Sequence, residues 1–276
     1  MSEQQAWAIV DDVASGIADC VFRDSLLSVY LVGSLPRGDF YPPKSEMDLL
    51  FFLTPSASNL ADAEILQGLR FVREIDARWR GTEGRSFPCV DIGPWIRHPE
   101  IPFRDHADLA SISKLAMSPG RKYVTVYGFD FAENARLLWG TEIREELTIV
   151  EPRELVALDV ARLNASLRTY VRLDDREWAV REARTGYRVR CSTMSVGRTL
   201  FLAYGKRTLL KWPVFRDFDV TVPHFSGKEF FSQVLVPEYL DPEFFLRKTD
   251  EQAMAYFQGC LEFAEGAASL LSALAG

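Results

Sequence analysis

Two spacings of apolar residues alternate along the first half of the chain, and each predicts a different kind of element. Largely apolar runs at 26–32 and 47–53 predict two buried strands. A helical pattern follows at about 58–80, and residues 86–95 predict a third strand that breaks at Gly93-Pro94. A helical spacing also opens the chain, through Trp7, Val10, Val13, Ile17 and Val21.

The segment before residue 150 adds two weaker patterns. Residues 122–127 predict an edge strand, and residues 135–140 predict a last helical turn that ends at Gly140. Strands interleaved with helices indicate an α/β or α+β sheet domain, which we assign to residues 1–150.

Helical patterns dominate after residue 150 and predict an all-α second domain at 151–276. They occupy 151–180, 184–205 and 250–274. Residues 212–243 contain four prolines among many aromatic residues, which predicts an irregular connection on the surface of that helical bundle.

Charge and cysteine spacing exclude several classes of function. The 276 residues carry a formal net charge of −7, which repels polyanions and attracts cationic small molecules, so nucleic acid is an unfavourable partner. The four cysteines form no CxxC pair and the three histidines show no ligand spacing, so we expect neither a zinc site nor a disulfide framework.

The first 22 residues lack a secretory pattern and no run approaches the roughly 20 apolar residues of a membrane span, so the cytoplasm is the expected location.

Candidate chemistry lies between the first two predicted strands. Gly33-Ser34 ends the first strand, and a glycine there lets backbone N–H groups approach phosphate oxygens. Glu46 and Asp48 stand two apart, so on an extended strand both carboxylates point the same way and repel unless a cation lies between them. Mg²⁺ prefers such carboxylate oxygens, and Asp91 on the third strand is a candidate third ligand.

Each of these residues also has a structural explanation. Gly33-Ser34 by itself fits an ordinary turn, and Glu46 and Asp48 also fit a solvated strand entrance. Asp91, before Ile-Gly-Pro, also fits a turn cap.

Together these residues resemble a known family. Gly33-Ser34, Arg37-Gly38, the segment Ser45-Glu46-Met47-Asp48-Leu49 and the later Asp91 are similar to the motifs of the DNA-polymerase-β-like nucleotidyltransferases. The size, the helical second half and the segment 138–140 look most like the aminoglycoside adenylyltransferases of the streptomycin and spectinomycin type. The chain differs in one respect, because Glu46 stands where the family usually has aspartate.

The resemblance implies an α+β protein, with a nucleotidyltransferase domain of mixed sheet and flanking helices before a helical-bundle domain. It implies transfer of AMP from ATP to a hydroxyl, with Mg²⁺ held by Glu46, Asp48 and Asp91. Asp91 is then a general base or a ligand of a second ion. The implied nucleotide-binding residues are Gly33, Ser34, Arg37, Ser45, Arg198, Lys206 and Lys211. Lys206 also fits a cation beyond a helix C-terminus.

The second domain contains a candidate binding site for a polyamine sugar. It consists of Asp174, Asp175, Glu177, Trp178 and Glu182, with Trp95 and Trp139 as further stacking candidates. The same segment contains Arg172, Arg176 and Arg181, so a salt-bridged solvent-exposed helix face is the simpler explanation.

Two classes of function follow from the resemblance. The first is an ATP- and magnesium-dependent adenylyltransferase acting on a small cationic acceptor, with an aminoglycoside expected; action on an RNA end or a protein hydroxyl is a variant of it. The second is a nucleotide-binding or regulatory protein that kept the fold and lost turnover, for which Glu46 is the motivating feature.

Overall fold

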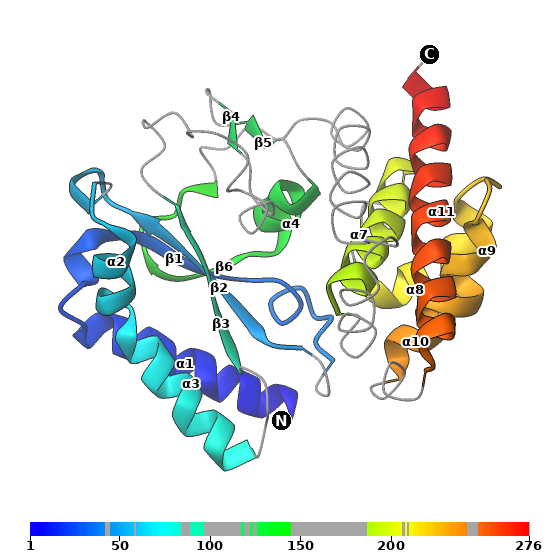
Figure 1. Cartoon of the computed structure of the whole chain (residues 1–276). Helices are drawn as coiled ribbons and strands as arrows, with labels where there is room; N and C mark the ends of the chain where they lie inside the picture. Colours follow the sequence, from blue (N-terminus) through cyan, green and yellow to red (C-terminus); the bar gives the residue numbers. More distant parts are fainter. Residues whose placement is uncertain are drawn as a thin grey trace. The chain divides into compact units, whose positions relative to one another are not determined.

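The structure is a computed structural model of the 276-residue chain (Figure 1). It describes residues 1–41, 45–57, 59–83, 89–96, 117–118, 122–123, 126–144, 187–205, 208, 210–241 and 248–275. The chain divides into two compact units, Met1–Ile149 and Val150–Gly276. The secondary structure is of the α+β class, and no helix in the described ranges combines the length and apolarity needed to cross a membrane.

A mixed four-stranded sheet forms the centre of the first unit (Figure 1). Its order is β3-β2-β1-β6, with β1 at Leu26–Val32, β2 at Met47–Leu53, β3 at Val90–Ile96 and β6 at Arg136–Gly140. Strand β1 is antiparallel to β2 and to β6, whereas β2 and β3 are parallel. The sequence therefore located β1 and β2 well, because both are buried apolar runs.

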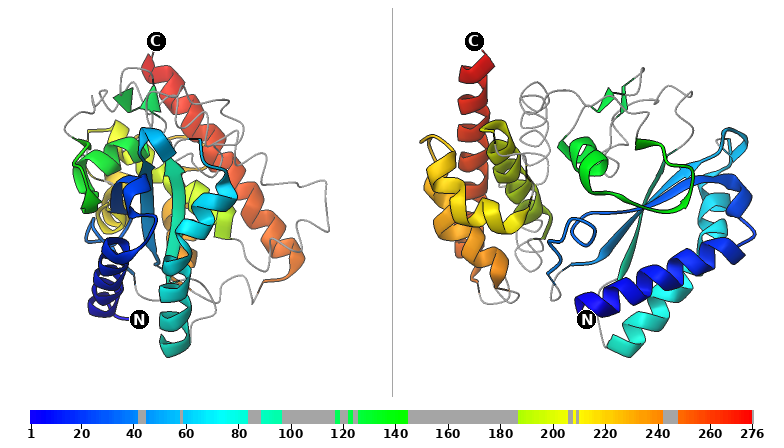
Figure 2. Two further views of the ribbon diagram at one scale, coloured as in Figure 1. Left: turned by 90° about the vertical axis from the view of Figure 1, so that its left-hand side faces the viewer. Right: turned by 180° about the vertical axis from the view of Figure 1, so that it is seen from behind.

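One face of the sheet is covered by α1 (Glu3–Asp19) and α3 (Arg70–Glu83), which lie side by side (Figure 2). Their apolar stripes bury the side chains of alternate strand residues. This core contains Ile9, Val13, Ile17, Val29, Leu31, Leu49, Phe51, Val72 and Ile75. Helix α1 ends at Asp19, so Val21 lies outside it and is exposed, contrary to the helical spacing in the sequence.

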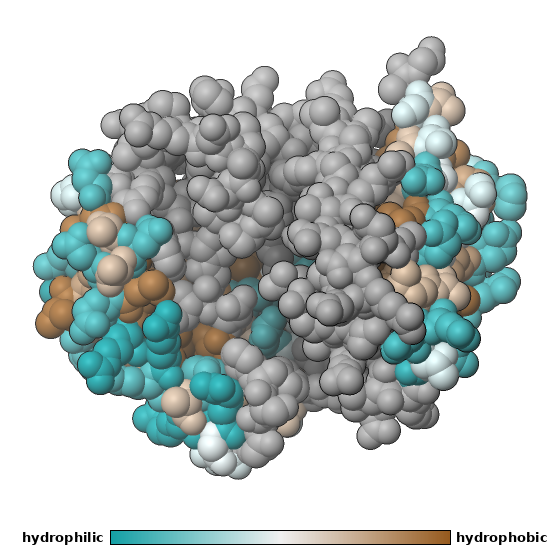
Figure 3. All heavy atoms as spheres, viewed as in Figure 1, coloured by the Kyte–Doolittle hydropathy of each residue, from teal (hydrophilic) through white to brown (hydrophobic). Residues whose placement is uncertain are grey.

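The predicted helix at about 58–80 is two helices, α2 (Asp62–Gly68) and α3. The break follows Gly68, where a Cβ would lie 2.3 Å from the Phe22 ring. The outward face of α3 remains polar, with Arg73, Glu74 and Arg78 exposed, and this part of the surface is largely hydrophilic (Figure 3).

The opposite face of the sheet carries a smaller core with α4 (Val126–Asn134). It consists of Tyr30, Leu50, Phe52, Phe131 and Ala135. The Tyr30 ring meets Phe131 edge-on at a centroid distance of 4.8 Å and Phe52 at 5.9 Å. Residues 48, 50 and 52 alternate with the α1-facing residues of β2, so Asp48 extends this second face toward the start of the strand.

Within residues 135–140, expected as a helical turn, Arg136–Gly140 forms strand β6 instead. Ser28 of β1 pairs with Gly140, and Leu31 pairs with Arg136. The expectation was wrong because it used only the local sequence pattern. The strand forms because the second edge of β1, from a distant part of the chain, offers hydrogen-bonding groups to these residues.

The third strand continues past Gly93-Pro94, where a break was expected. Leu49 pairs with Ile92 and Phe51 pairs with Trp95, so β3 contains one more residue than β2 over this interval. This irregularity accommodates the proline, and β3 is an end strand of the described sheet, where a missing N–H costs no ladder bond on its outer side.

The expected edge strand at 122–127 is present only in part. Strand β5 (Lys122–Tyr123) pairs with β4 (Met117–Ser118) in a separate two-stranded sheet. Helix α4 begins directly afterwards at Val126.

Every described element of the second unit is helical. These elements are α7 (Tyr187–Ala203), α8 (Lys211–Thr221), α9 (Lys228–Phe230), a π-helical turn (Phe231–Leu235), α10 (Val236–Leu240) and α11 (Asp250–Ala275). Their core is aromatic, with Phe218 and Phe231 at a centroid distance of 4.2 Å and Phe231 stacked on Phe263 at 5.3 Å. The predicted helix at 151–180 lies outside the described residues.

Residues 212–243, expected as an irregular surface connection, are largely helical and contribute to this core. Pro213 lies in the first turn of α8, and Pro237 lies in α10, which continues the π-helical turn Phe231–Leu235 without a break. The N–H groups of the first turn of α8 have no partner within that helix, so proline is tolerated there and does not mark a loop.

Candidate functional site

The carboxylate of Asp48 lies against the backbone of Gly33, at the end of β1. Gly33 has φ +82°, and a Cβ on it would lie 2.2 Å from Asp48 Oδ2. Val32, the residue before Gly33, is the register partner of Asp48 on β2. The glycine is therefore required twice, for its left-handed backbone and for the space that the carboxylate occupies.

Backbone hydrogen bonds shape the loop that follows Gly33. The N–H of Asp39 donates to the carbonyl oxygen of Ser34 at 2.8 Å, and the N–H of Gly38 donates to Leu35 at 3.1 Å. Ser34 is buried within this turn. The loop is therefore compact at its start.

The far end of the loop is closed by Ser45. Its hydroxyl accepts from the N–H of Tyr41 at 2.9 Å, and its own N–H donates to the Tyr41 carbonyl at 2.8 Å. Ser45 thus fixes the chain one residue before Glu46, which is partly buried at the entrance to β2.

Arg37 ties the loop to α4. Its buried guanidinium lies 3.4 Å from Asp39 Oδ2 and forms an ion pair and hydrogen bond with Asp130 of α4. Asn134 donates a hydrogen bond of 2.8 Å to the other oxygen of Asp130. Arg37 was expected to bind nucleotide, whereas here its charge is engaged by two carboxylates of its own unit.

The backbone register places Asp91 beside Asp48. The two are partners across the parallel β2–β3 pair, and Met47 pairs with Val90 one position earlier. The side chain of Asp91 lies outside the described side chains. Among the side chains that are described, no group of three His, Cys, Asp or Glu residues is close enough to hold a metal ion, so the three-carboxylate site stays a prediction.

The second unit contains a buried cluster of two cations and one aromatic ring. Lys211 Nζ lies 5.6 Å from the ring centroid of Tyr239, and the guanidinium carbon of Arg190 also lies 5.6 Å from it. Both distances are within the range of cation–π attraction. Lys211 is one of the residues expected from the sequence, whereas Arg190 and Tyr239 are not. Tyr239 lies in the segment 212–243, which was expected to be an irregular connection.

The other expected residues of the second unit are located only in part. Arg198 lies in α7 and is partly buried. Lys206 and the acidic cluster of Asp174, Asp175, Glu177, Trp178 and Glu182 lie outside the described residues.

The two tryptophans expected as stacking candidates differ in what the structure describes. Trp139 of β6 is partly buried and packs against the α1 side of the core. Its position is explained by packing. The side chain of Trp95 is outside the described side chains.

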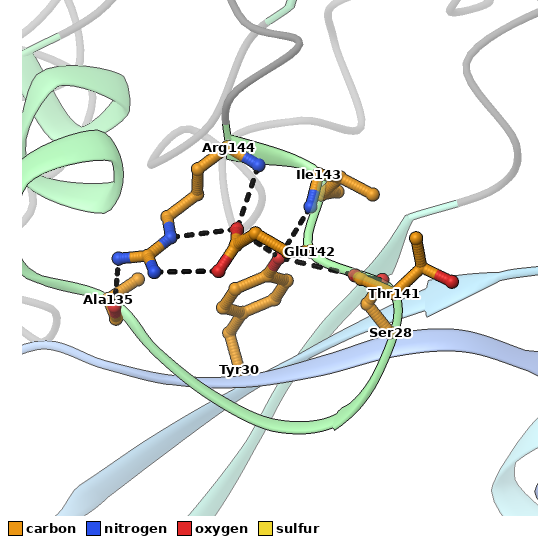
Figure 4. Close-up of polar contacts among 7 residues, drawn as sticks. All are labelled: Ser28, Tyr30, Ala135, Thr141, Glu142, Ile143 and Arg144. Atoms are coloured by element: carbon orange, nitrogen blue, oxygen red, sulfur yellow. Dashed lines mark hydrogen bonds and ion pairs between the residues drawn. The ribbon is translucent and has the colours of Figure 1, made fainter.

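A polar cluster that the sequence analysis missed joins β1 to the chain after β6 (Figure 4). The Tyr30 hydroxyl donates to Glu142 Oε1 at 2.8 Å and accepts from the N–H of Ile143 at 2.9 Å. Arg144 donates to both carboxylate oxygens of Glu142, at 2.9 and 2.7 Å. The cluster closes over the same aromatic face of the sheet that Asp48 extends.

The surroundings shift the pKa values of Tyr30 and Glu142 in opposite directions from their ordinary values. Burial raises the pKa of Tyr30 to about 12, with the neighbouring Glu142 adding to the effect. Hydrogen bonds from the Arg144 side chain lower the pKa of Glu142 to about 2. Tyr30 thus stays a neutral donor and Glu142 an anionic acceptor, which is the pairing that the geometry requires.

Comparison of the chain with models of known protein families gives no match, and no curated protein matches it significantly. The geometry above is therefore the basis for a functional assignment.

Proposed function

We propose that the unit Met1–Ile149 is a nucleotidyltransferase domain of the DNA-polymerase-β-like type and that the protein transfers AMP from ATP to a hydroxyl group. The observation that carries this proposal is the Asp48 carboxylate seated in the space left by Gly33, with Asp91 as its register partner. Register partners occupy the same face of a pleated sheet, so the pairing of Asp48 with Asp91 supports the proposal that these two acids and Glu46 form one site.

The donor set suits a hard divalent cation. Glu46, Asp48 and Asp91 would hold Mg²⁺, which when bound polarises phosphate oxygens and acidifies a coordinated hydroxyl. The Asp48 carboxylate lies against the Gly33 backbone, which limits its movement in that direction. A metal-binding carboxylate needs such a fixed position. Asp91 would either remove the acceptor proton as a general base or hold a second ion.

Phosphate recognition in the first unit is assigned to the turn that follows β1. Ser34 and the neighbouring backbone N–H groups bind the distal phosphates, as at other glycine turns. The family resemblance also implies Arg198, Lys206 and Lys211 as cations for the pyrophosphate, and of these Lys211 lies beside the ring of Tyr239. Arg37 holds the loop in shape through Asp39 and Asp130 and is not assigned to the nucleotide.

The acceptor is assigned from charge. A formal net charge of −7 favours a cationic, hydroxylated small molecule, and an aminoglycoside fits this chemistry. The acidic cluster at 174–182 is the candidate acceptor site. The reaction needs ATP and Mg²⁺, and the cytoplasm supplies both, so we propose a cytoplasmic location.

Mass spectrometry of candidate acceptors after incubation with ATP and Mg²⁺ tests the proposal. Active protein adds one AMP to the acceptor and releases pyrophosphate, and the Asp48→Asn variant does neither. A panel of aminoglycosides, other amino sugars, a protein substrate and an RNA separates the acceptor classes.

The alternative function, a nucleotide-binding protein without turnover, is favoured by Glu46 and has its own outcome in this experiment. Such a protein binds ATP with Mg²⁺ but labels no acceptor, and Glu46→Asp does not change this. Acquisition of transfer by Glu46→Asp would instead show that the longer side chain limits catalysis.

A further inference from the structure

We propose that Asp76, a residue of α3 outside every motif above, is a positioning residue that holds the start of β3 in register and so brings Asp91 beside Asp48. The part of this inference that concerns metal binding rests on the proposed function. The part that concerns the strand rests on the structure alone.

The Asp76 carboxylate is buried and directed at the backbone of β3. Its Oδ1 accepts hydrogen bonds from the N–H of Cys89 at 2.7 Å and of Val90 at 3.1 Å. Only 7% of the residue is exposed. Because the acceptor is a carboxylate, these are charge-assisted hydrogen bonds, stronger than the neutral bonds of an ordinary turn.

The same two residues are also the point where β3 joins β2. The carbonyl oxygen of Cys89 accepts from the N–H of Met47 at 3.0 Å, and Val90 is the register partner of Met47. The start of the strand is therefore held from the helix side by Asp76 and from the sheet side by β2. Asp91 is the next residue along.

The register of β3 is held by fewer neighbouring strands than the register of the inner strands. In the described sheet β3 is an end strand with β2 as its one neighbour. A slip of one residue moves every side chain to the opposite face of a strand, so it would remove Asp91 from the face of Asp48. A fixed point at 89–90 prevents such a slip.

The contact with Arg80 does not account for the position of Asp76. Arg80 Nε lies 2.8 Å from Asp76 Oδ2, one turn along the same helix, and its side chain is 39% exposed against 9% for Asp76. That ion pair uses the second oxygen and is partly screened by solvent. The oxygen directed at β3 is free to act on the strand, which makes Arg80→Met the matched control.

Hydrogen exchange of the full chain tests the role of Asp76 in the strand. Asp76→Ala removes the acceptor, so we expect the amides of Cys89 and Val90 to exchange about 10-fold faster or more. Arg80→Met should leave both amides protected. Asp76→Asn keeps an oxygen acceptor for the strand, and the Arg80→Met background avoids a clash between the new amide donor and Arg80. Most of the protection should therefore return, with exchange remaining somewhat faster than in Arg80→Met alone.

Binding of Mn²⁺ in the presence of α,β-methylene-ATP, followed by electron paramagnetic resonance, tests the metal-binding part. Asp76→Ala should weaken Mn²⁺ binding by about 10- to 100-fold, the usual effect of losing a group that orients a metal ligand. Affinity for the nucleotide without metal should change little. Arg80→Met should match the wild type, and the Asp76→Asn, Arg80→Met double variant should recover most of the affinity.

Each outcome has one meaning. Unchanged exchange at Cys89 and Val90 in Asp76→Ala overturns the role in the strand. Faster exchange with unchanged Mn²⁺ affinity overturns the metal-binding part while the proposed function stands. A wild-type protein that binds no Mn²⁺ with nucleotide overturns the proposed function together with that part. If Asp76→Ala does not fold, comparison of the double variant with Arg80→Met decides, because Asn is the weaker acceptor and should leave exchange measurably faster.

Discussion

At the scale of single residues, the site depends on the contact between Gly33 and Asp48. A left-handed backbone and a carboxylate at the place of the missing Cβ are two separate requirements, and Gly33 meets both. Gly38, five residues later, has a similar φ of +74° but nothing within 4 Å of its Cβ position. The chain thus contains a natural control for the second requirement.

Gly33→Ala should destabilise the protein more than Gly38→Ala and should also abolish nucleotide transfer. Both substitutions place alanine at positive φ, which costs about 1–2 kcal/mol. Only Gly33→Ala also drives a methyl group into the Asp48 carboxylate. Urea unfolding of the two variants measures the difference in the free energy of unfolding, and equal losses would show that the carboxylate moves away without cost.

Asp48→Asn should leave the fold intact and reduce transfer by more than about 100-fold, since loss of a group that merely orients a metal ligand already costs about 10- to 100-fold. The substitution keeps the shape and relieves repulsion among the acids, so the free energy of unfolding should not fall. Rates of pyrophosphate release and thermal melting check the two parts. Transfer at the wild-type rate would exclude Asp48 from the metal site.

At the scale of elements, the cluster of Tyr30, Glu142 and Arg144 fixes the chain after β6 on top of β1. Tyr30 is fully buried, and its hydroxyl both donates to Glu142 and accepts from the backbone. Because Glu142 stays ionised to about pH 2 in the folded protein, the contribution of this cluster to stability depends on pH.

Glu142→Gln should be less stable than the wild type at neutral pH, and the difference should shrink as the pH falls. Folding lowers the pKa of Glu142 from its ordinary value of 4.5 to about 2. The stabilisation is therefore fully present above pH 4.5 and is lost as the pH falls from 4.5 toward 2. Urea unfolding of both proteins across that range tests this, and a difference that does not vary with pH would contradict it.

The contribution of Tyr30 to stability depends on pH in the alkaline range. Its pKa is raised from 10 to about 12, so its contribution is complete below pH 10 and is lost as the pH rises from 10 to 12. The cluster should therefore be most stabilising over the whole neutral range.

At the scale of the whole molecule, the formal net charge of −7 acts on any charged ligand before contact. The KM of a cationic acceptor should rise as salt is added up to about 0.15 M, where the screening length is about 8 Å. The KM of a neutral hydroxylated sugar accepted by the same site should not change. Steady-state kinetics at several salt concentrations measure both, and equal responses would show that the field plays no part in recognition.

Features that depend on residues close together in the sequence were predicted well, and features that depend on distant contacts were not. Strands β1 and β2 and helices α1 and α11 were predicted close to their observed positions, because their apolar periodicity is local and strong. Helix α2 ends at Gly68, which lies against the ring of Phe22, and this contact joins residues distant in the sequence. The helical character of 212–243 was missed because proline in a first turn resembles proline in a loop.

The sequence by itself determined the placement of Gly33-Ser34 and of the acids Glu46 and Asp48 at strand ends, because that follows from strand periodicity. Only the tertiary structure decided that β6 is a strand, since it pairs with β1, which lies far away in the sequence and supplies the hydrogen bonds. The tertiary structure also decided that Arg37 meets Asp130, that Asp76 meets β3 and that Tyr30 meets Glu142. Each of these pairs joins distant parts of the chain, and a sequence pattern records no information on which distant groups the packing of a core brings into contact.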